Sequence, residues 1–179
     1  MKLHRLKRFL KSRGGRRVII AIVAAILGGL GLSEQYSGGR SGPVPDGPVS
    51  GRARVIDGDS LRIGRHEIRL VGIDAPEGRQ SCQRGGRTWA CGQAAADRLR
   101  QLVRGRDVAC AAEKRDQHNR LLATCRVAGQ DINRAMIASG FAVAFGARYR
   151  SVEQQAKQQK AGLWSGSFQR PSDWRRQNL

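Results

Sequence analysis

Apolar and polar residues alternate over short runs from about residue 51 onward, which is the pattern of strands with one face in a core. Runs at 53–55 and 61–63 flank an Asp-Gly dipeptide at 57–58, and a longer run, HEIRLVGI, follows at 66–73. An Asp-Gly pair between alternating apolar residues is typical of a tight hairpin turn. The pattern therefore predicts three consecutive strands, of which the first two are joined by this turn.

The middle of the chain changes to a helical period and then returns to alternation. A polar loop containing Gly85 and Gly86 separates the third strand from residues 92–103, whose apolar side chains recur at helical spacing. Residues 107–111 and 121–127 alternate again and predict an antiparallel pair of strands. The sequence thus predicts five strands, with one helix between the third and the fourth.

Two more helices are predicted after the fifth strand. Asp131 is placed to cap a helix with apolar residues on one side, and 141–145 is a short extended run. Ser151 opens a third helix with Gln154 in the capping-box position, and Gly162 ends it. Five short strands with about three helices predict an α+β fold built on a five-stranded barrel of the oligonucleotide-binding (OB) type. An open α+β sheet is the alternative.

A basic head and an uncharged segment precede this domain. Residues 1–17 contain eight lysines or arginines and no acid, and the fifteen residues 18–32 carry no charge. We interpret them as an export signal retained as an anchor in the inner membrane, with the head in the cytoplasm and the domain in the periplasm or outside the cell. Cleavage and secretion is the alternative. The expected organisation continues with a Gly-, Pro- and Ser-rich linker at 33–50, a domain at 51–168 and a basic tail at 169–179, to which no role is given.

The charge of the chain is extreme, at +19 with 33 basic and 14 acidic residues. Without the basic head, 25 basic residues still face the 14 acids, so the domain is basic on its own account. Such a charge suits a polyanion such as nucleic acid, or an anionic membrane surface. Charge alone does not separate these partners from an ordinary charged surface.

Four cysteines agree with an oxidising compartment, because exported domains of this size commonly carry an even number. They are Cys82, Cys91, Cys110 and Cys125, and they can pair in three ways. We favour Cys82 with Cys91, stapling one loop, and Cys110 with Cys125, bridging neighbouring strands. Free buried thiols are one alternative. A zinc site is a weaker one, since no C-x-x-C pair is present.

Carboxylates gather at two predicted strand ends. Asp57 and Asp59 follow the first strand, while Asp74 and Glu77 follow the third. Acids without a cationic partner repel one another unless a cation lies between them, and hard oxygen ligands select Ca²⁺ or Mg²⁺ rather than zinc. Each loop considered separately is also compatible with an ordinary turn.

Two arginines favour chemistry over simple turns. Arg69 lies inside an apolar strand, where a guanidinium is costly to bury unless it meets an anion, and Arg120 stands at the start of the fifth strand. A metal held by carboxylates, together with two guanidinium forks that match phosphate oxygens, is the equipment of phosphoryl chemistry.

The order and spacing of five segments resemble the thermonuclease family, which has the staphylococcal-nuclease-like fold. The segments are VIDGDS, IRLVGIDAPE, RDQHNR, DINRAMIASG and AKQQKAGLW, and the resemblance covers residues 51–168. It implies calcium-dependent hydrolysis of phosphodiester bonds in DNA and RNA, leaving a 3′-phosphate, by a monomeric enzyme. Single-stranded substrates are expected.

The same resemblance implies a metal site. Asp59 and Asp74 match the direct Ca²⁺ ligands, and the backbone carbonyl of Ala75 matches a further one. Asp57 matches an acid close to the ion. The resemblance therefore makes Ca²⁺ the expected cofactor.

Three catalytic residues are implied in the same way. Glu77 matches the residue that orients and deprotonates the attacking water, and Arg69 and Arg120 match the two arginines that bind the phosphate. Loss of a preorganised donor of this kind costs on the order of 10²-fold or more in rate.

The chain departs from the family pattern where the nucleotide is bound. His118-Asn119 replaces a frequent Tyr-Gly, and Gln117 stands where the best-known member has a phosphate-binding lysine. Phe145 stands roughly where that member has a stacking tyrosine, and Tyr149 is nearby. Gln117, Phe145 and Tyr149 are therefore candidate substrate-binding residues, and the phenylalanine can stack on a base without donating a hydrogen bond.

Three hypotheses follow. The first is an exported, membrane-tethered, calcium-dependent nuclease. The second is a non-catalytic nucleic-acid-binding module, since OB-type barrels often bind without cutting. The third is a cell-envelope protein that uses its charge on anionic lipid. The complete set of acids and arginines favours the first, because a binding module has little use for it.

Overall fold

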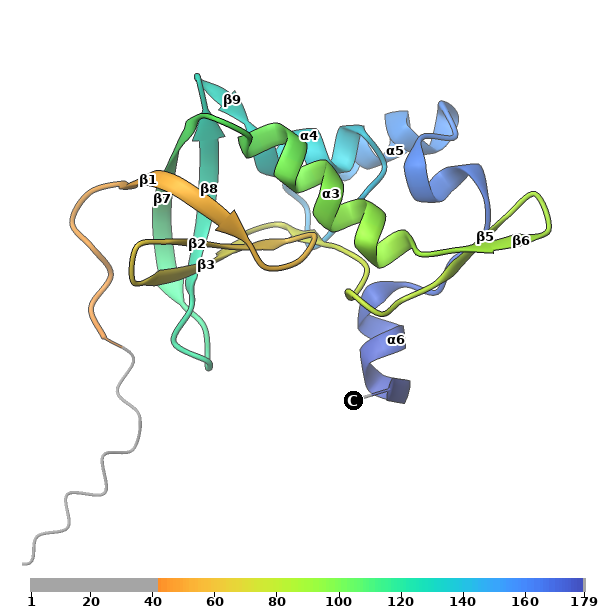
Figure 1. The fold of residues 1–179 in the computed structure, drawn as a ribbon, viewed down its shortest axis with the longest axis horizontal. Helices are drawn as coiled ribbons and strands as arrows, with labels where there is room; N and C mark the ends of the chain where they lie inside the picture. The colour runs from red at the N-terminus through yellow and green to blue at the C-terminus, as the bar shows by residue number, and fades with distance from the viewer. Residues whose placement is uncertain (1–41, 179) are drawn as a thin grey trace, which may run out of the picture. The chain divides into compact units, whose positions relative to one another are not determined.

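A computed structural model of the chain describes residues 42–178, and five of its strands close into a barrel (Figure 1). The strand order is β3-β2-β1-β7-β8, and β3 closes the barrel by pairing in parallel with β8. The predicted OB-type α+β fold is confirmed. The five barrel strands are β1 (Val49–Val55), β2 (Ser60–Ile63), β3 (His66–Leu70), β7 (Asp107–Arg115) and β8 (Leu121–Val127).

Strand β1 changes partner along its length, which is how a short barrel turns a corner. Its first half pairs with β7 and its second half with β2. Gly51 lies in the first half with φ of +146°, a conformation that L side chains rarely adopt. Glycine at this position therefore allows the strand to bend.

Four α-helices and one 3₁₀ turn, η1 (Gly162–Ser165), are present among the described residues. Helix α3 inserts between the third and fourth barrel strands, as predicted, and packs its apolar face on the barrel with α4. Asp131 is the N-cap of α4, because its side chain accepts a hydrogen bond from the backbone N–H of Arg134 at 2.9 Å. The α-helices are α3 (Cys91–Val103), α4 (Ile132–Ala138), α5 (Arg150–Gln158) and α6 (Pro171–Asn178).

The structure has several short strands where the sequence predicted one continuous strand or a loop. The predicted strand at 66–73 stops at Leu70, turns at Gly72 with positive φ, and resumes as β4 (Ile73–Asp74). The polar loop contains a hairpin of β5 (Cys82–Arg84) and β6 (Arg87–Trp89). Its two turn residues are glycines with positive φ, as a tight hairpin turn requires. Strand β10 (Val143–Ala144) pairs with β4, and β9 (Gln130–Asp131) with β8.

The predicted limits of the third helix were wrong. Helix α5 begins at Arg150 after Tyr149, with no side-chain cap, so Ser151 does not open it and Gln154 forms no capping box. The buried ring of Tyr149 fixes the start instead, because its hydroxyl donates to Asp131. The helix ends at Gln158, and Gly162 begins η1.

Both predicted disulfides are confirmed. Cys82–Cys91 ties β5 to the start of α3, and Cys110–Cys125 joins residues directly opposite each other on β7 and β8. No cysteine is free, so the zinc site and the free thiols are excluded. Two disulfides are typical of proteins in an oxidising compartment.

Most predictions for the N-terminal region concern residues that the structure does not describe. The basic head at 1–17, the apolar segment at 18–32 and the first half of the linker at 33–50 lie outside the described part of the chain. Among residues 42–178, no helix has the length and apolar character needed to cross a membrane.

Candidate active site

The Asp57-Gly58 turn is more than a hairpin connection, because it packs against two other parts of the fold. The side chain of Asp57 accepts a hydrogen bond from the N–H of Asp59 at 3.0 Å. A Cβ atom on Gly58 would come within 2.7 Å of the Ala75 Cβ and 2.8 Å of the Ala95 Cβ. Glycine therefore lets the loop approach the end of β4 and helix α3, and this approach buries Asp59.

Asp59 is a buried acid with several donors. It is 4% exposed, and its carboxylate accepts hydrogen bonds from the Ser60 hydroxyl, the Ala75 N–H and the Arg69 guanidinium. Burial raises its pKa to about 7, against the opposing pull of Arg69, and the nearby Asp57 and Asp74 carboxylates add to the rise. A buried carboxyl with a raised pKa is stabilised in its ionised form by positive charge close to it.

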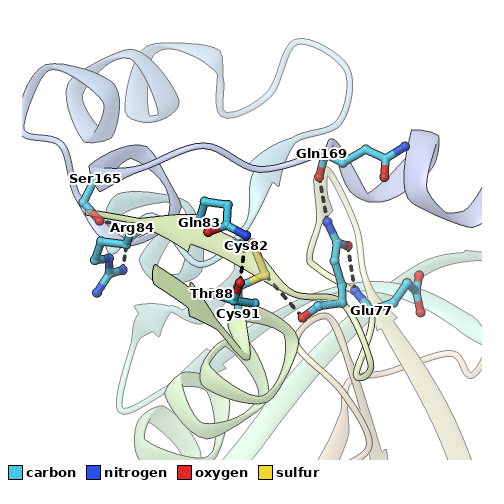
Figure 2. Close-up of a disulfide and its surroundings, with 10 residues drawn as sticks. Glu77, Cys82, Gln83, Arg84, Thr88, Cys91, Ser165 and Gln169 are labelled. Atoms are coloured by element: carbon cyan, nitrogen blue, oxygen red, sulfur yellow. Dashed lines mark hydrogen bonds between the residues drawn. A yellow bond between two sulfur atoms is a disulfide. The ribbon is translucent and has the colours of Figure 1, made fainter. Parts of the chain in front are cut away.

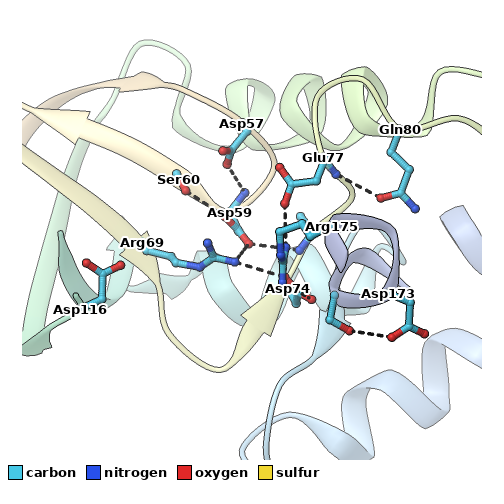
Figure 3. A network of polar contacts seen from close by, with 12 residues as sticks. Asp57, Asp59, Ser60, Arg69, Asp74, Glu77, Gln80, Asp116, Asp173 and Arg175 are labelled. Atoms are coloured by element: carbon cyan, nitrogen blue, oxygen red, sulfur yellow. Dashed lines mark hydrogen bonds and ion pairs between the residues drawn. The ribbon is translucent and has the colours of Figure 1, made fainter. Parts of the chain in front are cut away.

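Asp74 is brought beside Asp59 by the end of β4. The buried side chain of Asn133 donates to the Val71 and Ala123 carbonyls, which fixes the turn before β4 to the barrel. One nitrogen of Arg69 then reaches both acids, at 3.0 Å from Asp59 Oδ2 and 3.2 Å from Asp74 Oδ1 (Figure 3). The structure thus brings together the two predicted metal-binding carboxylates and the first predicted arginine.

Glu77 joins this group through an arginine that the sequence analysis did not single out. Arg175, on α6, donates from Nη1 to Asp74 Oδ1 at 2.9 Å and to Glu77 Oε1 at 2.7 Å, and from Nη2 to Asp74 Oδ2 at 3.2 Å (Figure 3). Burial opposes the charge, but the hydrogen bonds to Asp74 and Glu77 raise the pKa of Arg175 above its ordinary value. Arg175 is therefore a firmly held cation beside the acids.

The second predicted arginine, Arg120, faces the same groove from the start of β8. Its guanidinium is paired with Asp116, with the Nε–Oδ2 distance at 2.8 Å. Burial alone would raise the pKa of Asp116, but the backbone and side chain of Arg120 outweigh it and lower that pKa. Asp116 therefore holds Arg120 in place at the edge of the groove.

A groove of about 1110 Å³ runs past these residues, which is at the upper end of the usual size of ligand sites. Its wall contains Arg69, Glu77, Arg120 and Arg175. A neighbouring cavity shares the three arginines and adds Asp74, Gln117 and Phe145. The arginines thus line both hollows.

The predicted substrate-binding residues are placed differently from one another. Phe145 is 69% exposed at the second cavity, where Gln117 also lies. Tyr149 is buried, and its hydroxyl is used by Asp131. The structure does not place Tyr149 beside the candidate active-site acids and arginines.

The acids can be tested for a fit to calcium. Among residues 42–178, no three His, Cys, Asp or Glu side chains are arranged to hold a metal ion. However, Asp59 and Asp74 already share one cation, the Arg69 guanidinium, and all their donor atoms are oxygens. Hard cations accept such oxygens and complete their shell with water. The residues present therefore fit a calcium ion held by two carboxylates.

The sequence analysis did not single out Arg175, although the sequence contains a signal for the helix that carries it. Pro171 at the first helical position, Asp173 in the first turn and Arg175 in the last turn are the usual marks of a short helix. These marks predict α6 but not where its side chains reach. No comparable sequence signal exists for Gln80, a buried glutamine that links the Glu77 loop to the chain before α6.

The buried state of Asp59 predicts an unusual pH dependence of stability without metal. Its pKa is about 7 when folded and 3.8 in the reference state, so the folded chain binds the proton more tightly. The free energy of unfolding should then fall as the pH rises from about 4 to 7. Asp59→Asn should remove this fall and gain roughly 1–3 kcal/mol above pH 7.

Urea unfolding in chelator at pH 5 and pH 8 measures this difference. Asp97→Asn, on an exposed side chain, is the matched control and should behave as the wild type does. A wild-type free energy of unfolding that is equal at the two pH values, or that rises with pH, would show that Asp59 is ionised at little cost.

Fold and site together define a class: an OB-type barrel that carries a centre of paired carboxylates and arginines on one side. The staphylococcal nuclease homologue family matches residues 67–166, which is more than half of the chain. The chain belongs to this family.

Several curated proteins are similar to the chain, and two of those below are named endonucleases. The chain is 38% identical over 124 residues to the succinoglycan biosynthesis protein ExoI of Rhizobium meliloti, covering 65% of each chain. It is 30% identical over 147 residues to the probable endonuclease lcl3 of Botryotinia fuckeliana, covering 72% of this chain and 55% of the relative. An uncharacterized endonuclease of Escherichia coli O157:H7 is 33% identical over 137 residues, covering 70% and 83%. The chain thus spans less than two thirds of the first two relatives.

Proposed function

We propose that this protein is a calcium-dependent nuclease that hydrolyses phosphodiester bonds in single-stranded DNA and RNA. The observation that carries the proposal is the buried pair of Asp59 and Asp74 around Arg69, which lines the groove together with Glu77. Two relatives are named as endonucleases, which supports the same reaction class. A groove lined by arginines supports a polyanionic substrate.

Asp59, Asp74 and the carbonyl of Ala75 are the residues that would hold Ca²⁺. The ion, when bound, would act as a Lewis acid on a phosphate oxygen and neutralise the two acids. The rest of the chemistry belongs to the chain. Arg69 and Arg120 bind the other phosphate oxygens, where negative charge grows in the transition state.

Glu77 acts on water in this proposal. It is partly exposed to the groove, so a water molecule can reach its carboxylate. The carboxylate takes a proton as the water oxygen forms its bond to phosphorus. The bond between phosphorus and the 5′ oxygen breaks, the leaving oxygen is protonated from solvent, and a 3′-phosphate remains.

Export fits the same proposal. Two disulfides close in the described part of the chain, and disulfides persist in oxidising compartments. We propose that the domain acts outside the cytoplasm as a monomer, with the apolar segment at 18–32 as its export signal and anchor.

The deciding experiment uses the full chain, purified under oxidising conditions. End-labelled single-stranded DNA, duplex DNA and RNA are incubated with it in calcium, in magnesium or in chelator. We expect cleavage of the single strands in calcium, none in chelator, and DNA products that a polymerase extends only after phosphatase treatment.

A non-catalytic binding module gives a different result. It would retain the labelled strands in both calcium and chelator, with strong dependence on salt and no products. That outcome would replace the nuclease with the binding module. Binding to anionic vesicles but to neither nucleic acid would instead favour a role at the cell envelope.

A further inference from the structure

The segment before α6 is fastened to the disulfide hairpin of β5 and β6. Gln83 and Ser167 exchange two backbone hydrogen bonds, at 2.9 and 3.0 Å, as neighbouring strands do. The side chain of Arg84 donates to the Gly162 carbonyl. A small apolar cluster adds to this attachment, and it consists of the Cys82–Cys91 disulfide, which Figure 2 shows, together with Leu163, Trp89 and Phe168.

Gln80 connects the same segment to the active site. It is buried, its side-chain oxygen accepts from the Glu77 N–H at 3.3 Å (Figure 3), and its side-chain nitrogen donates to the Gln169 carbonyl at 2.7 Å. Pro171 begins α6 two residues after Gln169. The helix therefore starts at a fixed position relative to the Glu77 loop. The contacts of Gln80 and the hairpin thus determine where Arg175 lies.

Two neighbouring arginines on α6 differ in exposure and in the acids that they contact. Arg175 is 28% exposed and directs three hydrogen bonds to Asp74 and Glu77, whereas Arg176 is 74% exposed and pairs with Asp173 on its own helix. Holding a partly buried guanidinium against two acids costs desolvation, which the acids offset. A helix that only covered the barrel would not need such a contact.

The number of charges at the site explains what this contact does. Three acids, Asp59, Asp74 and Glu77, are matched by two guanidinium groups in the free protein. A divalent cation on Asp59 and Asp74 would repel both guanidiniums and use the Asp59 and Asp74 oxygens that they contact, so that Glu77 would remain the one acid paired with Arg175. The guanidinium of Arg175 would then lose its two hydrogen bonds to Asp74, yet it would remain at the groove because α6 is held by the hairpin. The N–H groups released from Asp74 can then donate to the oxygens of a phosphate.

We propose that Arg175 is a third arginine of the active site, which neutralises Asp74 and Glu77 in the free protein and binds a phosphate oxygen of the nucleic acid once a divalent cation holds Asp59 and Asp74. This inference rests on the proposed nuclease function. It makes α6 and its hairpin part of the catalytic structure. It also predicts opposite effects of one substitution on metal binding and on rate.

The test compares Arg175→Gln and Arg175→Lys with Arg176→Gln in the full, oxidised chain. Calcium affinity is measured by calorimetry without nucleic acid, and kcat and KM are measured on single-stranded DNA. Arg175→Gln should bind calcium several-fold more tightly, because a competing cation is gone, and should lose about 10²-fold in kcat/KM. Arg175→Lys should fall between, and Arg176→Gln should match the wild type in both measurements.

Each alternative role of Arg175 predicts a different outcome of these measurements. Faster cleavage by Arg175→Gln would show that Arg175 only blocks the acids, and unchanged affinity and rate would show that it only packs; either overturns the inference. A melting curve identifies a variant that fails to fold, in which case the folded lysine variant decides by the same two measurements. A wild type that binds calcium but cleaves nothing overturns the proposed function and, with it, the phosphate contact.

Discussion

Arg69→Ala should lower kcat/KM on single-stranded DNA by at least about 10²-fold, because it removes a preorganised donor from the developing charge. Arg69 lies on β3 and is fixed by hydrogen bonds to both Asp59 and Asp74. Its loss has a second effect, since the two acids then face each other without that cation. Without calcium, the variant should unfold at a lower urea concentration, and calcium should restore most of the difference.

Steady-state kinetics and urea unfolding, each with and without calcium, check both effects. Arg62→Ala is the matched control, because Arg62 lines the same groove but pairs with Glu67, away from the acids. It should change KM by only a few-fold. A loss for Arg69→Ala that is confined to KM and equals that of the control would mean that Arg69 supplies only general charge.

Glu77→Gln should lower kcat by about 10²- to 10⁴-fold, the usual contribution of a positioned base. The substitution keeps the shape of the side chain and an oxygen that can still accept from Arg175, so the fold should not change. Calcium affinity should change little, because the two acids paired through Arg69 are Asp59 and Asp74. The expected signature is therefore slow chemistry with normal metal binding.

Single-turnover cleavage in saturating calcium measures this effect directly, and calorimetry measures the affinity. Glu67→Gln, at another acid of the groove, should leave the single-turnover rate within a few-fold of the wild type. An unchanged rate in Glu77→Gln would remove Glu77 from the role of base. A large fall in calcium affinity would make Glu77 a ligand instead.

The barrel could be predicted from the sequence because each of its strands carries its own pattern. Alternation in β2, β3 and β8 matches their observed burial, and Asp131 caps α4 as its residue type suggests. The limits of α5 could not be predicted in this way. They depend on Tyr149 packing in the core against Asp131, a contact between residues 18 apart that no local pattern records.

The candidate site was predictable where its residues lie in recognisable segments. The Asp59, Asp74 and Arg69 side chains meet because neighbouring strands end at one place, which the strand pattern already implies. Arg175 comes from a short basic tail whose sequence gives no sign of its distant contact. Its place depends on the hairpin and on Gln80, and such contacts are seen only in the folded chain.

The wide spacing of the site along the chain has a consequence for the order of folding. Arg69 and Asp74 are five residues apart, whereas Asp74 and Arg175 are 101 apart. The barrel itself closes only when β3 finds β8, and long closures are slow because they cost chain entropy before any contact repays it. The acids should therefore meet Arg69 early, and the centre should reach its final charge balance only when the last helix docks.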